Sequence, residues 1–482
     1  METVLTYLNP CEIVLPLVAT YPCETLERIL STFVKNNPNN VCVERLSETK
    51  ISDSIEKDGL ESISSSLFDV DSILSCIRQL GSYLMQFNLE GILRSKKNFR
   101  AFCTPAQNLV MDGITLRNLE IFTNNTDGGV RGSLFSVLDH TCTPFGRRML
   151  RDWISKPLLS KTKIEQRLCV VAELAENWKS DFVRVTRKEL AGCPDIENGL
   201  TLVSLKKSSP AKFIKTVNQL DKLRTLFLKF REEVVKKFSS CQLLVTIFEN
   251  ISRLLGSSRL EDYLVRLNRV EAEHNNKIKL FNASLLSNKY AFPDVFSAKS
   301  DIASLENELE IYRNSRLPKL LGKFSVEYKS VSGLEYLVEI KNKELGVVPS
   351  DWIKITATKQ VTRFRPPWVD ATFKKLCRAR EKLVLAANEA WLQFLEEFSL
   401  QHYEDCKCAV EQIATFDCLM SLSVVAKQPG YCRPLFVDED CIEIQDGRHP
   451  VIEGLLGSGE QYVANGTLLK KDRKVSQIFI EW

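Results

Sequence analysis

Apolar residues recur at helical spacing along most of the chain. From Leu67 onward they follow the i, i+3, i+4 pattern, with Leu74, Ile77, Leu80 and Leu84 on one face. This spacing is typical of an amphipathic helix that buries one stripe against a core. The pattern therefore predicts a mainly α-helical protein from this point on.

Residues that interrupt helices are rare in three long stretches. Residues 211–292 contain one glycine and no proline, residues 294–317 contain neither, and residues 368–428 contain neither over 61 positions. A helix of that length would extend about 90 Å. No heptad pattern is sustained and no repeat of fixed length occurs, so the stretches favour long lever-like helices over a coiled coil or a solenoid.

A segment of different period, residues 319–366, separates the last two helical stretches. Apolar residues alternate with polar ones at Phe324, Val326 and Tyr328, and the alternation resumes after the turn Ser332-Gly333. Period 2 on both sides of a glycine turn predicts a small antiparallel sheet. We expect this β-insertion at the tip of a pair of long helices.

Charge is balanced overall but uneven in the insertion. The chain has 65 basic and 61 acidic residues, which by itself indicates no partner. Residues 319–365 hold nine bases and five acids, and residues 352–365 hold four bases and no acid, with Thr and Gln between them. Such residues can hold phosphates and fix register on nucleic acid. A solvated polar face explains the same composition, so both interpretations stay open on composition alone.

Catalytic and metal-binding motifs are not found. The 15 cysteines include no C-x-x-C pair and only four histidines occur, which favours reduced thiols over a zinc site. No phosphate-binding loop, dinucleotide fingerprint or hydrolase motif is present. The acidic cluster Glu306, Glu308 and Glu310 is interpreted as a solvated helix face. We also expect no secretory signal and no membrane-spanning segment.

Residues 105–200 are rich in loops and contain a clear helix start. Thr143 is expected to cap a helix whose first residue is Pro144, and Pro157 is expected to end it. A shorter helix is expected from Ser133 through Leu138. Near the end of the chain, residues 441–444 and 475–480 read as strands of a new domain.

Several ordered motifs resemble the MutS mismatch-repair family. They are LRNLEI at 116–121, GSLFSVLDH at 132–140, TPFGRRML at 143–150, WIK at 352–354, YCRP at 431–434 and GRHPVI at 447–452. Within the family, residues 114–120 and 9–16 are most similar to the eukaryotic third homologue, one subunit of the MutS-beta heterodimer. The resemblance covers nearly the whole chain.

The resemblance implies an architecture that matches the pattern of helices and strands. Residues 1–66 would be a remnant of the connector domain, 67–318 the core and ascending lever helices, and 319–366 a β clamp. Residues 367–435 would be the returning lever helices, and 436–482 the truncated start of an α/β ATPase domain. The expected fold class is therefore mainly α, with long levers, a helical core and a small antiparallel clamp.

The resemblance also implies site residues and partners. The clamp would bind the backbone of double-stranded DNA that carries insertion or deletion loops, and Tyr462 would stack on a nucleotide base. The expected clamp contacts are Lys341, Asn342, Lys343, Lys354, Lys359, Gln360 and Arg363. The expected partner is a second MutS homologue, and the expected location is the nucleus, with no membrane association.

The chain departs from the family pattern at both ends. The family's N-terminal mismatch-reading domain is not in this sequence, and neither is its G-P-N-x-x-G-K-S loop, which binds ATP with Mg²⁺. We therefore expect that this chain alone neither hydrolyses ATP, holds that cofactor tightly, nor discriminates mismatches. A protein-interaction remnant and a meiotic recombination homologue are the alternative interpretations.

Overall fold

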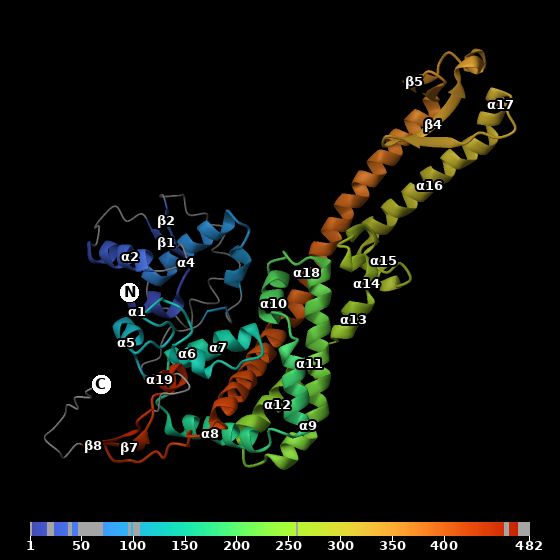
Figure 1. Cartoon of the computed structure of the whole chain (residues 1–482). Coiled ribbons are helices and arrows are strands. Elements are labelled where there is room, and N and C mark those ends of the chain that lie inside the picture. The colour runs from blue at the N-terminus through green and yellow to red at the C-terminus, as the bar shows by residue number, and fades with distance from the viewer. Residues whose placement is uncertain are drawn as a thin grey trace. The chain divides into compact units, whose positions relative to one another are not determined.

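The computed structural model of the chain describes residues 2–16, 24–36, 41–46, 71–94, 98–99, 107–256, 259–456 and 462–470. The chain divides into two compact units. Unit 1 comprises residues 1–207, 215–259 and 401–482, and unit 2 comprises residues 208–214 and 260–400. Helices dominate both units (Figure 1), so the prediction of a mainly α fold is confirmed.

Unit 1 combines short helices with two small sheets. Its own helices are α1 (Glu2–Leu8), α2 (Glu24–Asn36), α4 (Asp71–Met85), η3 (Glu90–Arg94), α5 (Gly113–Asn118), α6 (Leu134–Leu138), α7 (Pro144–Ser155), α8 (Lys161–Glu176), α9 (Asp181–Ala191), α10 (Ile196–Ser204), α12 (Gln242–Gly256) and α19 (Pro450–Leu455). Its strands are the parallel pair β1 (Glu12–Pro16) and β2 (Cys42–Leu46), and the antiparallel pair β7 (Cys441–Gly447) and β8 (Asn465–Lys470).

Unit 2 consists of helices followed by one antiparallel sheet. Its own helices are α13 (Leu260–Val265), α14 (Arg269–Glu273), η5 (Lys277–Lys279), α15 (Leu286–Ala291), α16 (Pro293–Ser315), α17 (Leu317–Leu321) and η6 (Asn342–Val347). Its strands are β3 (Tyr328–Val331), β4 (Leu334–Lys341), β5 (Ile353–Ala357) and β6 (Val361–Arg365), in the spatial order β3-β4-β6-β5. The small antiparallel sheet predicted from the period-2 pattern is confirmed.

Two helices contribute residues to both units, α11 (Pro210–Lys237) and α18 (Pro367–Ala426). Helix α18 is 60 residues long and occupies almost the whole stretch that lacks glycine and proline. One 18-residue window of α18 has a mean hydropathy of 1.4, which is apolar enough to cross a membrane. Because 67% of that window is buried inside the protein, we interpret α18 as a core helix.

Aromatic side chains fill the interior of each unit, and α18 contributes to both sets. In unit 1 the ring of Phe182 lies 5.5–6.0 Å from the rings of Phe230, Phe238, Phe248 and Phe416. In unit 2 Phe213 packs edge-on against three rings of α18, those of Trp391, Phe394 and Phe398. Edge-to-face contacts of this kind add about 0.5–1.5 kcal/mol per pair beyond the burial of apolar area.

A buried carboxylate of α18 holds the start of α7. Asp417 is fully buried and accepts hydrogen bonds from the backbone N–H of Cys142 (2.9 Å), the N–H of Thr143 (2.9 Å) and the hydroxyl of Thr143 (2.7 Å). Thr143 in turn caps α7 by accepting from the N–H of Gly146, as its sequence position predicts. One side chain therefore satisfies donors 274 residues away in sequence.

Gly146 is required by the close approach of that carboxylate. A Cβ atom at position 146 would lie 2.2 Å from Oδ2 of Asp417 and 2.8 Å from the hydroxyl oxygen of Thr143. Any larger residue would displace the buried carboxylate from its donors. The glycine two positions after Pro144 therefore follows from packing, whereas Thr143 and Pro144 follow from local helix geometry.

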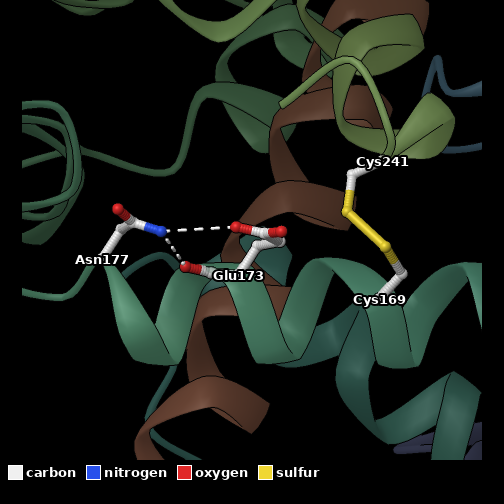
Figure 2. Close-up of a disulfide and its surroundings, with 4 residues drawn as sticks. All are labelled: Cys169, Glu173, Asn177 and Cys241. Atoms are coloured by element: carbon white, nitrogen blue, oxygen red, sulfur yellow. Dashed lines mark hydrogen bonds between the residues drawn. A yellow bond between two sulfur atoms is a disulfide. The ribbon is translucent and has the colours of Figure 1, made fainter. Parts of the chain in front are cut away.

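Cys169 and Cys241 are joined by a disulfide, which the sequence did not predict. Figure 2 shows the bond between α8 and the residue just before α12, with a Cα–Cα distance of 6.1 Å. On the same helix, the side-chain N–H of Asn177 donates to the carbonyl oxygen of Glu173 and closes the end of α8. The expectation of reduced thiols is wrong for this pair, because sequence spacing carries no information on a pair 72 residues apart.

One sequence-based expectation, the strand expected for residues 475–480, lies outside the described residues. The described strand β7 begins at Cys441 as expected but continues to Gly447, three residues beyond the strand expected for residues 441–444. Helix α7 ends at Ser155, two residues before Pro157.

Removal of the Asp417 carboxylate is expected to destabilise unit 1 strongly. In the Asp417→Ala variant the three donors of Cys142 and Thr143 lose their acceptor in a buried site. Because each orphaned buried group costs about 1–3 kcal/mol, we expect a loss of at least about 3 kcal/mol in the free energy of unfolding. Urea denaturation followed by circular dichroism measures the loss. The matched control is Asp438→Ala, whose side chain is 96% exposed and pairs with Lys161 at 3.2 Å, and it is expected to stay within about 0.5 kcal/mol of the parent.

Asp417 also predicts a pH dependence with a definite sign. Burial raises the pKa of Asp417 above its ordinary value of 3.8, and the bonds from Cys142 and Thr143 offset this only in part. The folded state then binds the proton more tightly than the unfolded state. Stability from this group is therefore greatest below pH 3.8 and falls as pH rises through the folded-state pKa. The free energy of unfolding of the parent minus that of Asp417→Asn should therefore fall as pH rises over that range, and a rise of this signed difference with pH would refute the assignment.

The disulfide is expected to contribute measurably to stability. Reduction with dithiothreitol, or the Cys241→Ser substitution, should lower the free energy of unfolding by about 2–4 kcal/mol, because the cross-link restricts the unfolded chain. Non-reducing peptide mapping should recover the peptides of Cys169 and Cys241 as one linked species. The control is Cys432→Ser, which removes an exposed free thiol. Equal stability of the reduced and oxidised protein would contradict the expectation.

Candidate nucleic-acid interface

The sheet of unit 2 is carried on two packed helices, α16 and α18. Leu309 of α16 packs with Val369 and Leu376 of α18 in one buried cluster, and the rings of Tyr312 and Trp368 stack at 4.4 Å. Figure 1 shows the sheet at the end of these helices, next to α17. The helices therefore form a firm support for the sheet.

The sheet has a small core and defined turns of its own. Val338, Ile340 and Trp352 pack with Leu317 and Leu321 of α17. Ser332 and Gly333 both have positive φ (52° and 80°), as the tight hairpin turn between β3 and β4 requires. These contacts fix the backbone of the sheet and with it the positions from which its exposed side chains extend.

Four of the predicted clamp residues are exposed lysines without an ion pair or side-chain hydrogen bond, among all contacts described for the chain. We call them the sheet lysines: Lys341, Lys343, Lys354 and Lys359. The N–H of Asn342 donates to the carbonyl oxygen of Gln360 at 2.9 Å, which brings the end of β4 and the β5–β6 turn together. Lys341, Lys343 and Lys359 therefore share one end of the sheet, while Lys354 lies on the edge strand β5.

Two other predicted residues are occupied by contacts within the sheet. Asn342 donates to the carbonyl oxygen of Thr358 (3.0 Å) and accepts from the hydroxyl of Thr362 (2.8 Å). Arg363 forms an ion pair with Glu339 across β4 and β6 at 2.8 Å, and its side chain is only 15% exposed. These residues hold the strands together, and the sheet lysines with the exposed Gln360 remain directed at solvent.

Arg365 explains why composition overstates the basic character of this segment. It is 7% exposed, donates to the carbonyl oxygen of Glu335 and pairs with Asp370 at 3.2 Å. The pKa of Asp370 is lowered, chiefly by its hydrogen bond from Lys374 and also by Arg365. Two of the four bases in residues 352–365, Arg363 and Arg365, are therefore structural.

One exposed pair beside the sheet was not singled out from the sequence. Lys323 pairs with Glu344 at 2.7 Å, and its hydrogen bond is the main reason why the pKa of Glu344 is lowered. This pair ties the segment after α17 to η6. Nothing in the sequence marks it, because the two residues are 21 positions apart.

Tyr462 lies in unit 1, just before β8. The guanidinium of Arg448 is 5.5 Å from the centroid of its ring and also pairs with Glu453. His449 caps α19 by accepting from the N–H of Ile452. The described residues thus place a cation against this ring, which leaves base stacking by Tyr462 as a prediction.

The chemistry available on the sheet is electrostatic. Unpaired ammonium groups on a rigid surface attract phosphates, and no base-reading geometry is implied. Among the described residues, no group of three or more His, Cys, Asp or Glu side chains could hold a metal ion. The sheet is therefore suited to binding a polyanion backbone.

Comparison with known proteins gives a consistent result. Residues 114–423 match the model of MutS domain III, which covers well over half of the chain. The human DNA mismatch repair protein Msh3 is 36% identical over 98% of this chain, and the mouse Msh3 is 34% identical over 98%. A Cryptococcus neoformans MSH3 is 34% identical over 82% of the chain.

The chain is shorter than these relatives. The matched part covers 42% of the human protein, 43% of the mouse protein and 32% of the fungal one. The matched residues nevertheless include the supporting helices, the sheet and the Asp417 anchor of α7. On the strength of the domain match and of these identities, the chain belongs to the MutS family and is Msh3-like.

Proposed function

We propose that this chain acts in DNA mismatch repair by gripping the backbone of double-stranded DNA through the sheet of unit 2. The observation that carries the proposal is the set of four unpaired, exposed sheet lysines on a rigid support. Membership of the MutS family supports the same activity, since the relatives compared here are mismatch repair proteins by name.

The parts of the proposal that concern a whole protein rest on the family alone. On this ground we propose that the whole protein prefers DNA with insertion or deletion loops and pairs with a second MutS homologue. We also propose that it is located in the nucleus and that its ATPase domain binds ATP with Mg²⁺. The division into connector, core, lever, clamp and ATPase segments is proposed on the same ground. Because the matched relatives are named for mismatch repair, a role in meiotic recombination is not favoured.

Binding through lysines alone has a characteristic strength and salt dependence. Each phosphate neutralised by a lysine releases counterions, so the logarithm of the binding constant falls by about 0.9 for each logarithmic unit of salt. Four contacts give a slope of roughly −3 to −4. The binding should be independent of sequence, because phosphates are the same at every step.

Replacement of the sheet lysines is expected to weaken the salt dependence of DNA binding. The variant changes Lys341, Lys343, Lys354 and Lys359 to Gln, which keeps a flexible polar side chain at each position and removes four charges. We expect at least a tenfold loss of duplex affinity at about 50 mM salt and a slope closer to zero by up to about 3.6. Fluorescence anisotropy with a labelled duplex at several salt concentrations measures both.

A matched control removes four exposed lysines of unit 1. The control positions are Lys163, Lys179, Lys188 and Lys236. This variant has the same net charge as the sheet variant, so a general effect of charge would weaken both equally. An unchanged slope in the sheet variant, or an equal loss in the control, would show that the sheet is not the DNA-binding surface.

A further inference from the structure

Helix α18 carries a second set of exposed cations that the sheet does not include. Lys375, Arg378 and Lys382 are all exposed, and they make no ion pair, hydrogen bond or ring contact among those described for the chain. Their spacing of three and four residues places them on one face of the helix. We call these three residues the arm stripe.

The other cations of the same helical segment are used structurally. Lys374 pairs with Asp370 at 2.9 Å, and Arg380 pairs with Glu306 of α16 at 3.2 Å and with Glu335 of β4 at 2.9 Å. Residues 374–382 contain five bases and one acid, Glu381. The paired cations of this segment thus make contacts within unit 2, whereas the arm stripe faces solvent.

The surroundings of the arm stripe favour a polyanion over a protein partner. No large apolar side chain is exposed between Trp368 and Val384, a part of α18 that is described throughout, so the exposed apolar residues Trp368 (40%), Val384 (44%) and Leu385 (71%) lie beyond the two ends of the arm stripe and not at its centre. Protein interfaces generally bury an apolar or aromatic centre and contain few lysines. A row of cations without such a centre is suited to phosphates, which a guanidinium can hold through two hydrogen bonds.

The dimensions of the arm stripe agree with those of a duplex backbone. Seven residues of helix separate Lys375 from Lys382, a rise of about 10 Å. Phosphates on one strand advance about 3.4 Å along the duplex axis, so the arm stripe extends over about three base-pair steps. The sheet and the arm stripe belong to consecutive elements, since β6 ends at Arg365 and α18 begins at Pro367.

We propose that the arm stripe is a second surface that contacts the DNA backbone, engaged by the same duplex that the sheet lysines hold. The proposal rests on the proposed function of the sheet and extends it from the sheet to the supporting helix. Lys375 and Lys382 contact phosphates as point charges, and Arg378 contacts one through its planar guanidinium. The contact is independent of DNA sequence.

The test compares the salt slopes of five proteins, namely the parent, the sheet variant and three variants of α18. The arm-stripe variant carries Lys375→Gln, Arg378→Gln and Lys382→Gln, and we expect its slope for a long duplex to be smaller in magnitude than that of the parent by up to about 2.7. The Lys374→Gln variant, which alters a paired lysine of the same segment, should keep the parent slope. A charge-preserving variant with Lys375→Arg and Lys382→Arg should also keep it, and circular dichroism of all five proteins checks that the helix is intact.

The outcomes separate the two proposals. If the sheet variant loses its slope and the arm-stripe variant keeps it, the arm stripe is not a DNA contact, although the sheet proposal stands. If only the arm-stripe variant loses part of its slope, α18 contacts DNA without the sheet, and both the sheet proposal and the proposal that one duplex engages the two surfaces fail. If neither loses it, both fail. If Lys374→Gln lowers the slope as much as the arm-stripe variant does, the loss reflects net charge alone, and the proposal that the arm stripe contacts DNA is rejected.

Discussion

The carboxylate of Asp417 is the contact on which unit 1 depends. It satisfies three buried donors at the start of α7 and requires glycine at position 146. The preceding residue, Phe416, points into the aromatic cluster around Phe182. Two adjacent residues of α18 thus connect the helix to two different neighbours, by a buried polar network and by ring contacts. A buried charge that lost its donors would be costly, so the arrangement holds only when all its members are in place.

Local features of the fold could be predicted from the sequence, and distant pairings could not. The cap at Thr143, the helix start at Pro144, the long helix that lacks glycine and proline, and the alternating strands all follow from rules that act over a few residues. Asp417 follows from no such rule, because its partners are more than 270 positions away. The disulfide between Cys169 and Cys241 could not be predicted for the same reason, because its two residues are also far apart in the sequence. The resemblance to a family singled out the motif that contains Gly146, whereas the structure supplied the physical reason for the glycine.

The candidate interface shows what charge counting can and cannot provide. The basic segment was found by composition, and four of its lysines are indeed exposed and unpaired. Composition could not separate them from Arg363 and Arg365, which pair with Glu339 and Asp370 inside the sheet and at the start of α18. Composition also did not single out Lys375, Arg378 and Lys382. Paired cations lie between them in the sequence, so their position on one helix face is not apparent from a count of charges. Only the positions of the acidic partners distinguish a structural cation from an available one.

The length of α18 between its contacts constrains which insertions and deletions this protein can accept. Within unit 2, Arg380 reaches Glu306 and Trp391 donates to the carbonyl oxygen of Ser208 at 2.9 Å. These two residues are 11 positions apart, about three helical turns, and so lie near the same line along the helix. One inserted residue would rotate everything beyond it by about 100° and turn one of the two away from its partner. Variation in chain length among relatives is therefore expected in the loops at either end of the helix, and between these contacts only in steps close to whole turns.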